Sequence, residues 1–251
     1  MEEKGNWYRR VLMPAGILGI CAVLGAAAWK LSDREGGITE LSPAGVVSDR
    51  TEENQEENQP QEQELLESRK IALTFDDGPH PVYTEEMLEV LEEHQVPATF
   101  FLLGQNIEGH EEVVRRIAEK GHLIGNHTFH HVQVTGLSRE QACAEIDETS
   151  RLIESVTGKG TEYVRPPFGT WNEGLEEDLD LIPVMWTIDT KDWMTENVDA
   201  IVEHVVQNAG ENDIILMHDC YESTVQATER IIALLQARGF EFVTVDEVLF
   251  D

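Results

Sequence analysis

From Lys70 to the C-terminus, short runs rich in β-branched and aromatic residues alternate with segments whose apolar residues recur at helical spacing. Seven runs predict strands, at residues 71–75, 98–103, 122–125, 163–165, 184–188, 214–217 and 242–245. The intervening segments predict helices at 84–94, 111–120, 138–157 and 224–238. This alternation predicts an α/β domain with a mostly parallel sheet, closed into a β/α barrel of about seven units; a doubly wound open sheet is the alternative.

The third of these helices has clear signals at both ends. Ser138 is followed three residues later by Gln141, which is the spacing of a capping box. Gly158 follows the last apolar position of the segment, and glycine commonly ends a helix. The sequence therefore predicts both boundaries of this helix.

The pattern before Lys70 is different. Residues 1–10 include three positive side chains, and residues 11–29 then carry no charge over 19 positions, close to the length of a transmembrane helix. Positive residues before the span place residues 1–10 in the cytoplasm and everything after the span outside. A cleaved signal peptide is the alternative, because residues 26–28 are small. Residues 30–69 are acidic, polar and aperiodic, which predicts a disordered linker before a folded domain at 70–251.

The charge of the chain excludes one class of partner. Asp and Glu number 49 against 18 Lys and Arg, giving a formal net charge of −31. Such an excess of carboxylates does not attract nucleic acid through a basic patch, so no nucleic-acid partner is expected. Of the three cysteines, Cys21 lies in the apolar N-terminal segment, and Cys143 and Cys220 either pair or remain two free thiols.

Polar residues with chemical potential follow most of the predicted strands. In chain order they are Asp76 with Asp77, His127, Arg165, Asp189 and His218. In a β/α barrel the carboxyl ends of all strands lie on one face, where active sites are found. We therefore expect these side chains to meet at one mouth of the barrel.

The segment from Asn126 to His131 suggests a metal site. His127 and His131 are four residues apart, and together with an aspartate they could form a two-histidine, one-carboxylate set that leaves positions open for water and substrate. His130, three residues after His127, would also serve as the second imidazole. The adjacent Asp76 and Asp77 can then have different roles: one carboxylate binds the cation and the other accepts a proton from water.

Five motifs occur in a family-specific order. They are TFDDGP at 74–79, HTFHH at 127–131, RPPFG at 165–169, DTKDW at 189–193 and LMH at 216–218. With them, the chain resembles the polysaccharide deacetylase family, the NodB-like carbohydrate esterases, over nearly all of residues 70–251. The resemblance implies a distorted (β/α)7 barrel. It also implies hydrolysis of N-acetyl groups on N-acetylglucosamine-type sugars, or of O-acetyl esters, with zinc or with cobalt, nickel or manganese as alternatives.

The resemblance assigns a role to each residue of the metal half of the site. Asp77, His127 and His131 are implied as metal ligands. Asp76 is implied as the general base, and Arg165 as the residue that orients it through a charge-assisted hydrogen bond.

The resemblance also assigns roles to the general acid, to its carboxylate partner and to the residues of the pocket. His218 is implied as the general acid that protonates the departing amine, and Asp192 as the carboxylate that raises its pKa. Leu216 and Trp193 are implied to line the pocket for the acetyl methyl group and the sugar face, and a backbone N–H near Phe168 to bind the oxyanion. Asp189 either shares the tuning of the acid or only braces its loop.

Three positions depart from the family pattern. Phe168 stands where a tyrosine is frequent, His130 replaces the usual serine or threonine before the second histidine, and Val132 replaces a proline.

We expect a monomeric, membrane-tethered, extracytoplasmic deacetylase that acts on a polysaccharide, with the N-acetylglucosamine of peptidoglycan as the leading substrate. An O-acetyl esterase, or a deacetylase of another glycan such as chitooligosaccharide or xylan, is the alternative in the same class. An inactive glycan-binding module is the alternative in another class.

Overall fold

The computed structural model describes residues 69–172 and 174–250. The predicted cytoplasmic end, the membrane span at 11–29 and nearly all of the linker lie outside these residues. Within the described part, no helix has both the length and the apolar character that a bilayer crossing needs.

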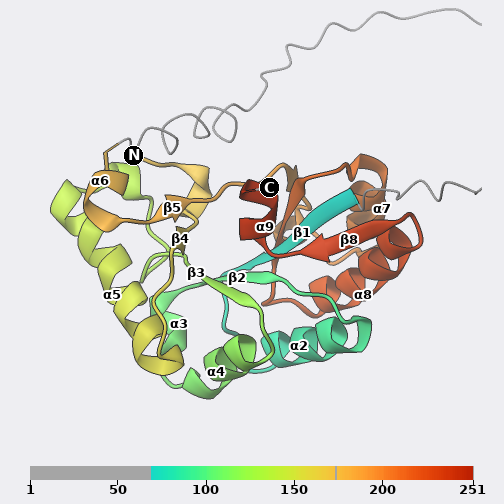
Figure 1. Ribbon diagram of the computed structural model, residues 1–251, viewed down its shortest axis with the longest axis horizontal. Coiled ribbons are helices and arrows are strands. Elements are labelled where there is room, and N and C mark those ends of the chain that lie inside the picture. Colours follow the sequence, from blue (N-terminus) through green and yellow to red (C-terminus); the bar gives the residue numbers. More distant parts are fainter. Residues whose placement is uncertain (1–68, 173, 251) are drawn as a thin grey trace, which may run out of the picture. The chain divides into compact units, whose positions relative to one another are not determined.

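The described residues form one sheet of eight strands, and every paired strand in it is parallel to its neighbour. The strands are β1 (Arg69–Asp76), β2 (Thr99–Leu102), β3 (Leu123–Asn126), β4 (Tyr163–Val164), β5 (Ile182–Pro183), β6 (Ile188–Asp189), β7 (Asp213–His218) and β8 (Phe240–Val243). Their order is β5-β4-β3-β2-β1-β7-β6, and β8 pairs with the first half of β1. The sheet is curled and flanked by helices (Figure 1), as expected for a β/α half-barrel.

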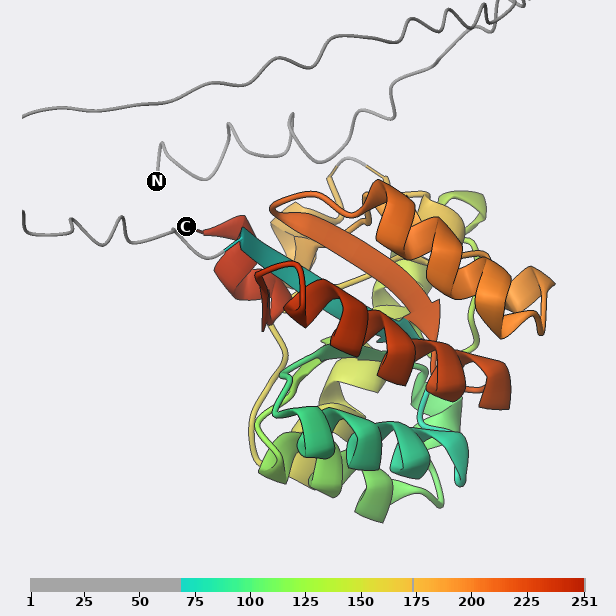
Figure 2. The same cartoon turned by 90° about the vertical axis from the view of Figure 1, so that its right-hand side faces the viewer.

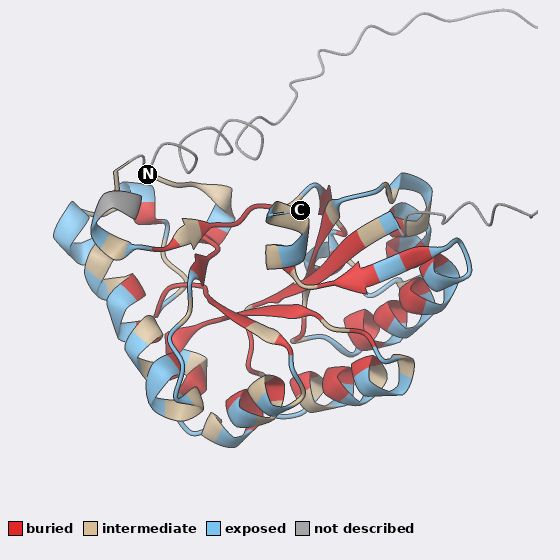
Figure 3. Ribbon diagram, in the orientation of Figure 1, coloured by how far each residue is buried: buried red, intermediate tan, exposed pale blue. Residues whose placement is uncertain are grey.

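Helices connect the strands and cover the outside of the sheet (Figures 1 and 2). The α-helices are α2 (Tyr83–His94), α3 (Gly104–Ile107), α4 (Glu111–Glu119), α5 (Arg139–Thr157), α6 (Glu176–Leu179), α7 (Val198–Asn208), α8 (Glu222–Gln236) and α9 (Val245–Leu249). Short 3-10 turns lie at Val134–Gly136, Pro167–Gly169 and Asp192–Met194. Figure 3 shows most of the sheet buried, whereas the long helices alternate between buried and exposed positions, as amphipathic helices should.

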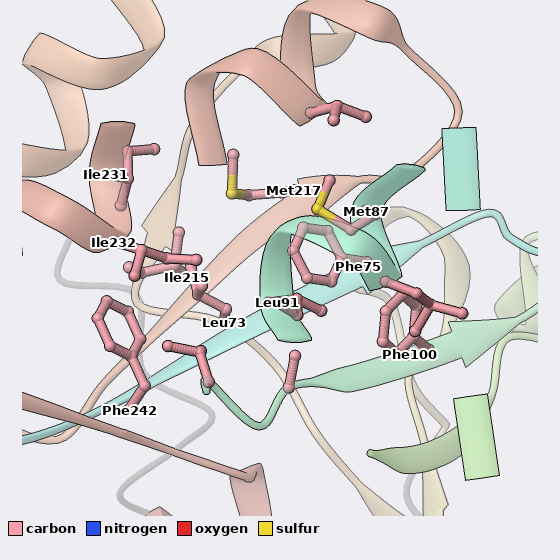
Figure 4. Packing of buried hydrophobic residues seen from close by; sticks show 14 of the residues in the cluster. Leu73, Phe75, Met87, Leu91, Phe100, Ile215, Met217, Ile231, Ile232 and Phe242 are labelled. Carbon is pink, nitrogen blue, oxygen red and sulfur yellow. The ribbon is translucent and has the colours of Figure 1, made fainter. Parts of the chain in front are cut away.

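Strand β1 lies at the centre of the core because its two faces bury different side chains. Ile71, Leu73 and Phe75 point toward the covering helices and join the main cluster of buried residues, with side chains of α2 and α8 (Figure 4). The alternate residues are smaller and more polar, and in an extended strand they must face the inside of the curl. Thr74 and Asp76 are the last two of that inner set, and both are buried.

The fifth predicted strand, at 184–188, is wrong. The structure instead has β5 before this segment and β6 at its end, with no strand pairing across residues 184–187. The guanidinium of the buried Arg165 donates hydrogen bonds to the carbonyls of Val184 (3.2 Å) and Met185 (3.1 Å). These carbonyls are therefore satisfied by a side chain inside the curl and not by a neighbouring strand. In the described residues β5 and β6 do not pair, so the sheet is open at this point.

Other predicted elements are confirmed within a few residues. Both hydrogen bonds of the capping box between Ser138 and Gln141 are present, and α5 ends at Gly158 in the left-handed conformation, with φ 73°. The last strand begins two residues earlier than predicted, and Val245 opens α9 instead of ending the strand. The apolar pattern of the sequence did not predict α3, α6, α7 or α9. Cys143 and Cys220 are free thiols.

Candidate active site

Three side chains converge at the carboxyl end of the sheet. Asp77 follows β1 directly, whereas His127 and His131 lie in the loop after β3. Oδ1 of Asp77 lies 3.5 Å from Nε2 of His127 and 3.5 Å from Nε2 of His131. All three donor atoms lie within 4.8 Å of one another. Donor atoms of a tetrahedral shell with bonds of about 2 Å lie about 3.3 Å apart, so the two measured separations suit a divalent cation such as zinc.

The hydrogen bonds and the electrostatics of these groups also fit the binding of a cation. Nδ1 of the buried His127 lies 2.6 Å from the carbonyl oxygen of Arg165. A carbonyl can only accept, so Nδ1 donates to it, and Nε2 is the ring nitrogen that faces Asp77. Oδ1 of Asp77 is buried and has no hydrogen-bond partner in the described residues. Burial lowers the pKa of His131, partly opposed by the charge of Asp77, and so favours the neutral imidazole that metals bind.

His130 is held away from this cluster. Its ring Nδ1 and its backbone N–H each contact the carboxylate of Glu145 on α5, at 2.9 Å. The side chain of His130 is exposed, whereas that of His131 is only about one-third exposed and faces Asp77. Of the two candidate histidines, it is His131 that the fold turns toward the aspartate.

Asp76 lies beside the cluster and is held by a buried arginine. Nη1 of Arg165 donates to Oδ1 of Asp76 at 2.8 Å and to Oγ1 of Thr74 at 2.6 Å. The guanidinium also lies over the ring of Phe101, 4.2 Å from its centroid. Oδ2 of Asp76 is 3.7 Å from Nε2 of His127, on the side of the cluster. A fully buried ion pair of this kind fixes the carboxylate in one orientation.

On the other side, His218 ends β7 in register with Asp76 of β1. Its Nδ1 lies 2.8 Å from Oδ1 of Asp192, whose carboxylate also accepts from the backbone N–H of His218 at 2.7 Å and from Oγ1 of Thr224 at 2.8 Å. Burial opposes the charged imidazole, but the hydrogen bond and charge of Asp192 prevail and raise the pKa of His218 to about 9. His218 is therefore protonated at neutral pH.

The remaining predicted residues surround this centre. Phe168 is 63% exposed and packs edge-on against His131, with ring centroids 4.8 Å apart. Trp193 is 51% exposed and follows Asp192 in its 3-10 turn, while Leu216 is buried two residues before His218.

Asp189 lies apart from the acid pair. Its Oδ1 accepts from the backbone N–H of Lys191 at 2.9 Å, so it braces the turn, and Asp192 is the residue that contacts His218.

Known proteins resemble the chain across this whole domain. The family model for polysaccharide deacetylase matches residues 64–184. A chitooligosaccharide deacetylase of Rhizobium leguminosarum bv. trifolii is 38% identical over 192 residues, covering 69% of this chain and 89% of the relative. The chain belongs to the polysaccharide deacetylase family.

Two other members of this family are larger proteins. The peptidoglycan-N-acetylmuramic acid deacetylase PdaC of Bacillus subtilis is 36% identical over 75% of this chain, and the peptidoglycan-N-acetylglucosamine deacetylase PgdA of Listeria monocytogenes is 35% identical over 72%. The chain spans about two fifths of their length, 41% and 39%. A solved structure of PdaC superimposes with a TM-score of 0.71 at 36% identity, covering 72% of this chain and 90% of that one.

Three residues around the site lie outside the five sequence motifs and were not predicted. Glu145 sequesters His130 from a position 15 residues away, for which the sequence holds no local signal. Asn106 lies just beyond the end of β2, so the strand-end argument could have found it; its Nδ2 donates to the carbonyl of Asp77 at 2.8 Å. Asp219, after β7, is fully buried and accepts from Thr84, and burial raises its pKa to about 7.

Proposed function

We propose that the protein is a metal-dependent deacetylase that removes N-acetyl groups from N-acetylglucosamine-type residues of a cell-wall polysaccharide. One observation carries the proposal: the carboxylate of Asp76, the imidazolium of His218 and a three-donor cluster lie around one point at the mouth of the sheet. A base, an acid and a Lewis-acid site are what amide hydrolysis requires.

The cation is assigned to Asp77, His127 and His131. A divalent ion there supplies Lewis-acid polarisation of the acetyl carbonyl and acidifies the attacking water. Zinc suits the two imidazoles and one carboxylate best, and cobalt, nickel and manganese are the alternatives.

The chain's own residues then move two protons. Asp76, oriented by Arg165, takes the proton of the attacking water as its oxygen bonds to the acetyl carbon. The backbone N–H near Phe168 is assigned to the negative charge that develops on the carbonyl oxygen. His218 gives its proton to the sugar nitrogen as the C–N bond breaks, so that a neutral amine and not an anion departs, together with acetate. Asp192 keeps His218 protonated until that step.

Peptidoglycan is the proposed substrate. The names of PdaC and PgdA support it, and an anchor at residues 11–29 with a linker at 30–69 would hold the domain within the wall. N-acetylglucosamine is the leading target, ahead of N-acetylmuramic acid. Chitooligosaccharide is the second candidate, because the Rhizobium relative carries that name and is covered over 89% of its length.

The test is acetate release by the full chain loaded with zinc, with peptidoglycan, chitooligosaccharide and O-acetylated xylan offered in parallel. Peptidoglycan should be the best substrate, and a chelator should abolish release. Asp76→Asn should lose about 10²- to 10⁴-fold in rate, whereas Asp147→Asn, which changes an exposed carboxylate on α5, should match the parent. Chelator-resistant release, or none on any substrate, would refute the proposal, and faster release from xylan would make the enzyme an esterase.

The proposed location is the cell membrane, with a single span, the catalytic domain outside and the protein a monomer. The support is the uncharged run at 11–29 after positive residues. Detergent, but not salt, should release the intact chain from the membrane fraction. A mature protein that begins just after Ala28 would show that the segment is a cleaved signal peptide.

A further inference from the structure

The backbone at Asp77 has a positive φ, which is uncommon for residues other than glycine. Its φ is 72°, in the left-handed region. This conformation turns the chain at the end of β1, and Oδ1 of the side chain then faces the two histidines. Contacts elsewhere must hold this turn, because a non-glycine residue in the left-handed region stores strain that the surroundings offset.

The short helix α3 (Gly104–Ile107) contacts the turn from one side. Nδ2 of Asn106 donates to the carbonyl oxygen of Asp77 at 2.8 Å. The backbone N–H of Leu103, just before α3, donates to the carbonyl oxygen of Gly78 at 2.9 Å. The carbonyls of Asp77 and Gly78 therefore both accept hydrogen bonds from residues 103–106.

The same helix also contacts the histidine loop. The backbone N–H of Gly104 donates to the carbonyl of Thr128 at 3.0 Å, and that of Gln105 to the carbonyl of Phe129 at 3.1 Å. Both carbonyls lie between His127 and His131. Helix α3 therefore joins the two loops that carry the three metal-ligand candidates, and Asn106 makes the side-chain contact to the aspartate loop.

The turn is also packed against a buried carboxyl. A Cβ atom placed on Gly78 would lie 2.6 Å from Oδ2 of Asp219, so that carboxyl is packed directly against the backbone. Oδ2 of Asp219 accepts from Oγ1 of Thr84 at 2.5 Å, and Oγ1 of Thr84 accepts from the backbone N–H of His80 at 2.7 Å. Asp219 thus packs against Gly78, and Asn106 holds the carbonyl of Asp77, so loss of Asn106 would remove the one side-chain hydrogen bond to that carbonyl in the described residues.

We propose that Asn106 is a positioning residue that sets the distance between Asp77 and the pair His127 and His131, and thereby the affinity of the site for its cation. The inference rests on the metal centre of the proposed function. Groups that orient metal ligands from outside the coordination shell typically change metal affinity by about 10- to 100-fold.

The test compares four full-length proteins in detergent: the parent, Asn106→Ala, Asn106→Asp and Gln105→Ala. The dissociation constant for zinc ion is measured by competition with a chromophoric chelator, and the melting temperature of each metal-free protein is recorded. Asn106→Asp keeps the size of the side chain but has no N–H to donate. Its added negative charge would by itself strengthen cation binding, so weaker binding in this variant isolates the lost hydrogen bond. Gln105→Ala changes the exposed neighbour and keeps its backbone bond to Phe129.

We expect both Asn106 variants to bind zinc at least about 10-fold more weakly than the parent, with Gln105→Ala unchanged and the metal-free melting temperatures close together. Zinc affinity equal to that of the parent in both Asn106 variants would overturn the inference, whether or not the metal-free melting temperature is lowered. The proposed function would still stand. A parent that binds no zinc would instead overturn the metal centre itself.

Discussion

At the scale of single residues, the site depends on which side chain carries a proton. The carboxylate of Asp192 is buried and accepts hydrogen bonds from the backbone and ring of His218, from Thr224 and from the backbone of Trp193. The hydrogen bond and the charge of Asp192 stabilise the imidazolium of His218. The pKa of His218, about 9, places the proton on the acid throughout the neutral range.

Replacement of Asp192 by Asn should therefore move the alkaline limb of the pH–rate profile. In the parent, kcat should fall as pH rises through about 9, because His218 must be protonated to act as the acid. Without the carboxylate, the burial that lowers the pKa of His218 is opposed by the weaker effects of the charges of Asp76 and Asp77, so the pKa falls and the alkaline limb should move to lower pH. The measurement is kcat between pH 5 and 10 on one soluble oligosaccharide. Asp189→Asn, which can still accept from Lys191, is the control, and an equal shift in both variants would contradict the role of Asp192.

The two adjacent histidines allow an equally direct comparison. His131→Ala removes a donor that faces Asp77 and should weaken zinc binding by more than about 100-fold, since even indirect partners of a ligand are worth 10- to 100-fold. His130→Ala removes the contacts of the ring to Glu145 and to Phe129, neither of which is a candidate metal ligand, and should change zinc affinity by less than about 3-fold. Chelator competition measures both. Stronger dependence on His130 would mean that the loop rearranges when the cation binds.

At the scale of elements, the strand ends could be predicted and the break in the sheet could not. Asp76 and His218 end strands with apolar runs that are visible in the sequence, and parallel strands bring their carboxyl ends to one edge. Residues 184–188 have the same apolar character, but the carbonyls of Val184 and Met185 bind the guanidinium of Arg165, about 20 residues earlier. A local pattern contains no information about which distant side chain will enter the curl.

Helix α3 shows the same limit, since its four residues give no periodic signal, yet it joins both ligand loops. Its first residue must be glycine: a Cβ at Gly104 would lie 2.4 Å from Cδ2 of Phe129 and 2.5 Å from Oγ1 of Thr149. Gly104→Ala should lower the free energy of unfolding by about 1–3 kcal/mol through this overpacking and should also weaken zinc binding.

Gly136→Ala is the matched control for that substitution. A Cβ there meets no other atom of residues 69–172 and 174–250 within 4 Å, and the position has no left-handed φ. Urea unfolding of the metal-free proteins should find it within about 0.5 kcal/mol of the parent. Equal stability of the two glycine variants would show that α3 moves freely against the histidine loop.

At the scale of the whole molecule, the charge of the chain should affect its response to its own product. Under the proposed function each turnover exposes an amine on a polymer, and the chain carries a formal net charge of −31. Protonated amines are attracted to such a surface, and salt screens the attraction over a Debye length of about 10 Å at 0.1 M. Product inhibition by extensively deacetylated polymer should therefore weaken as salt is raised. An inhibition constant that is independent of salt would show that the acidic groups lie away from the path of the glycan.

The pairing of β1 with β7 has a consequence for engineering this protein toward other acyl groups. Asp76 and His218 are register partners on neighbouring hydrogen-bonded strands, and such strands lie about 4.8 Å apart. The ladder of the sheet fixes that spacing, so no loop redesign will widen the gap to admit propionyl or butyryl chains. With Leu216 and Trp193 as the pocket walls that the family resemblance implies, room for a longer acyl tail has to come from shortening Leu216 or moving Trp193.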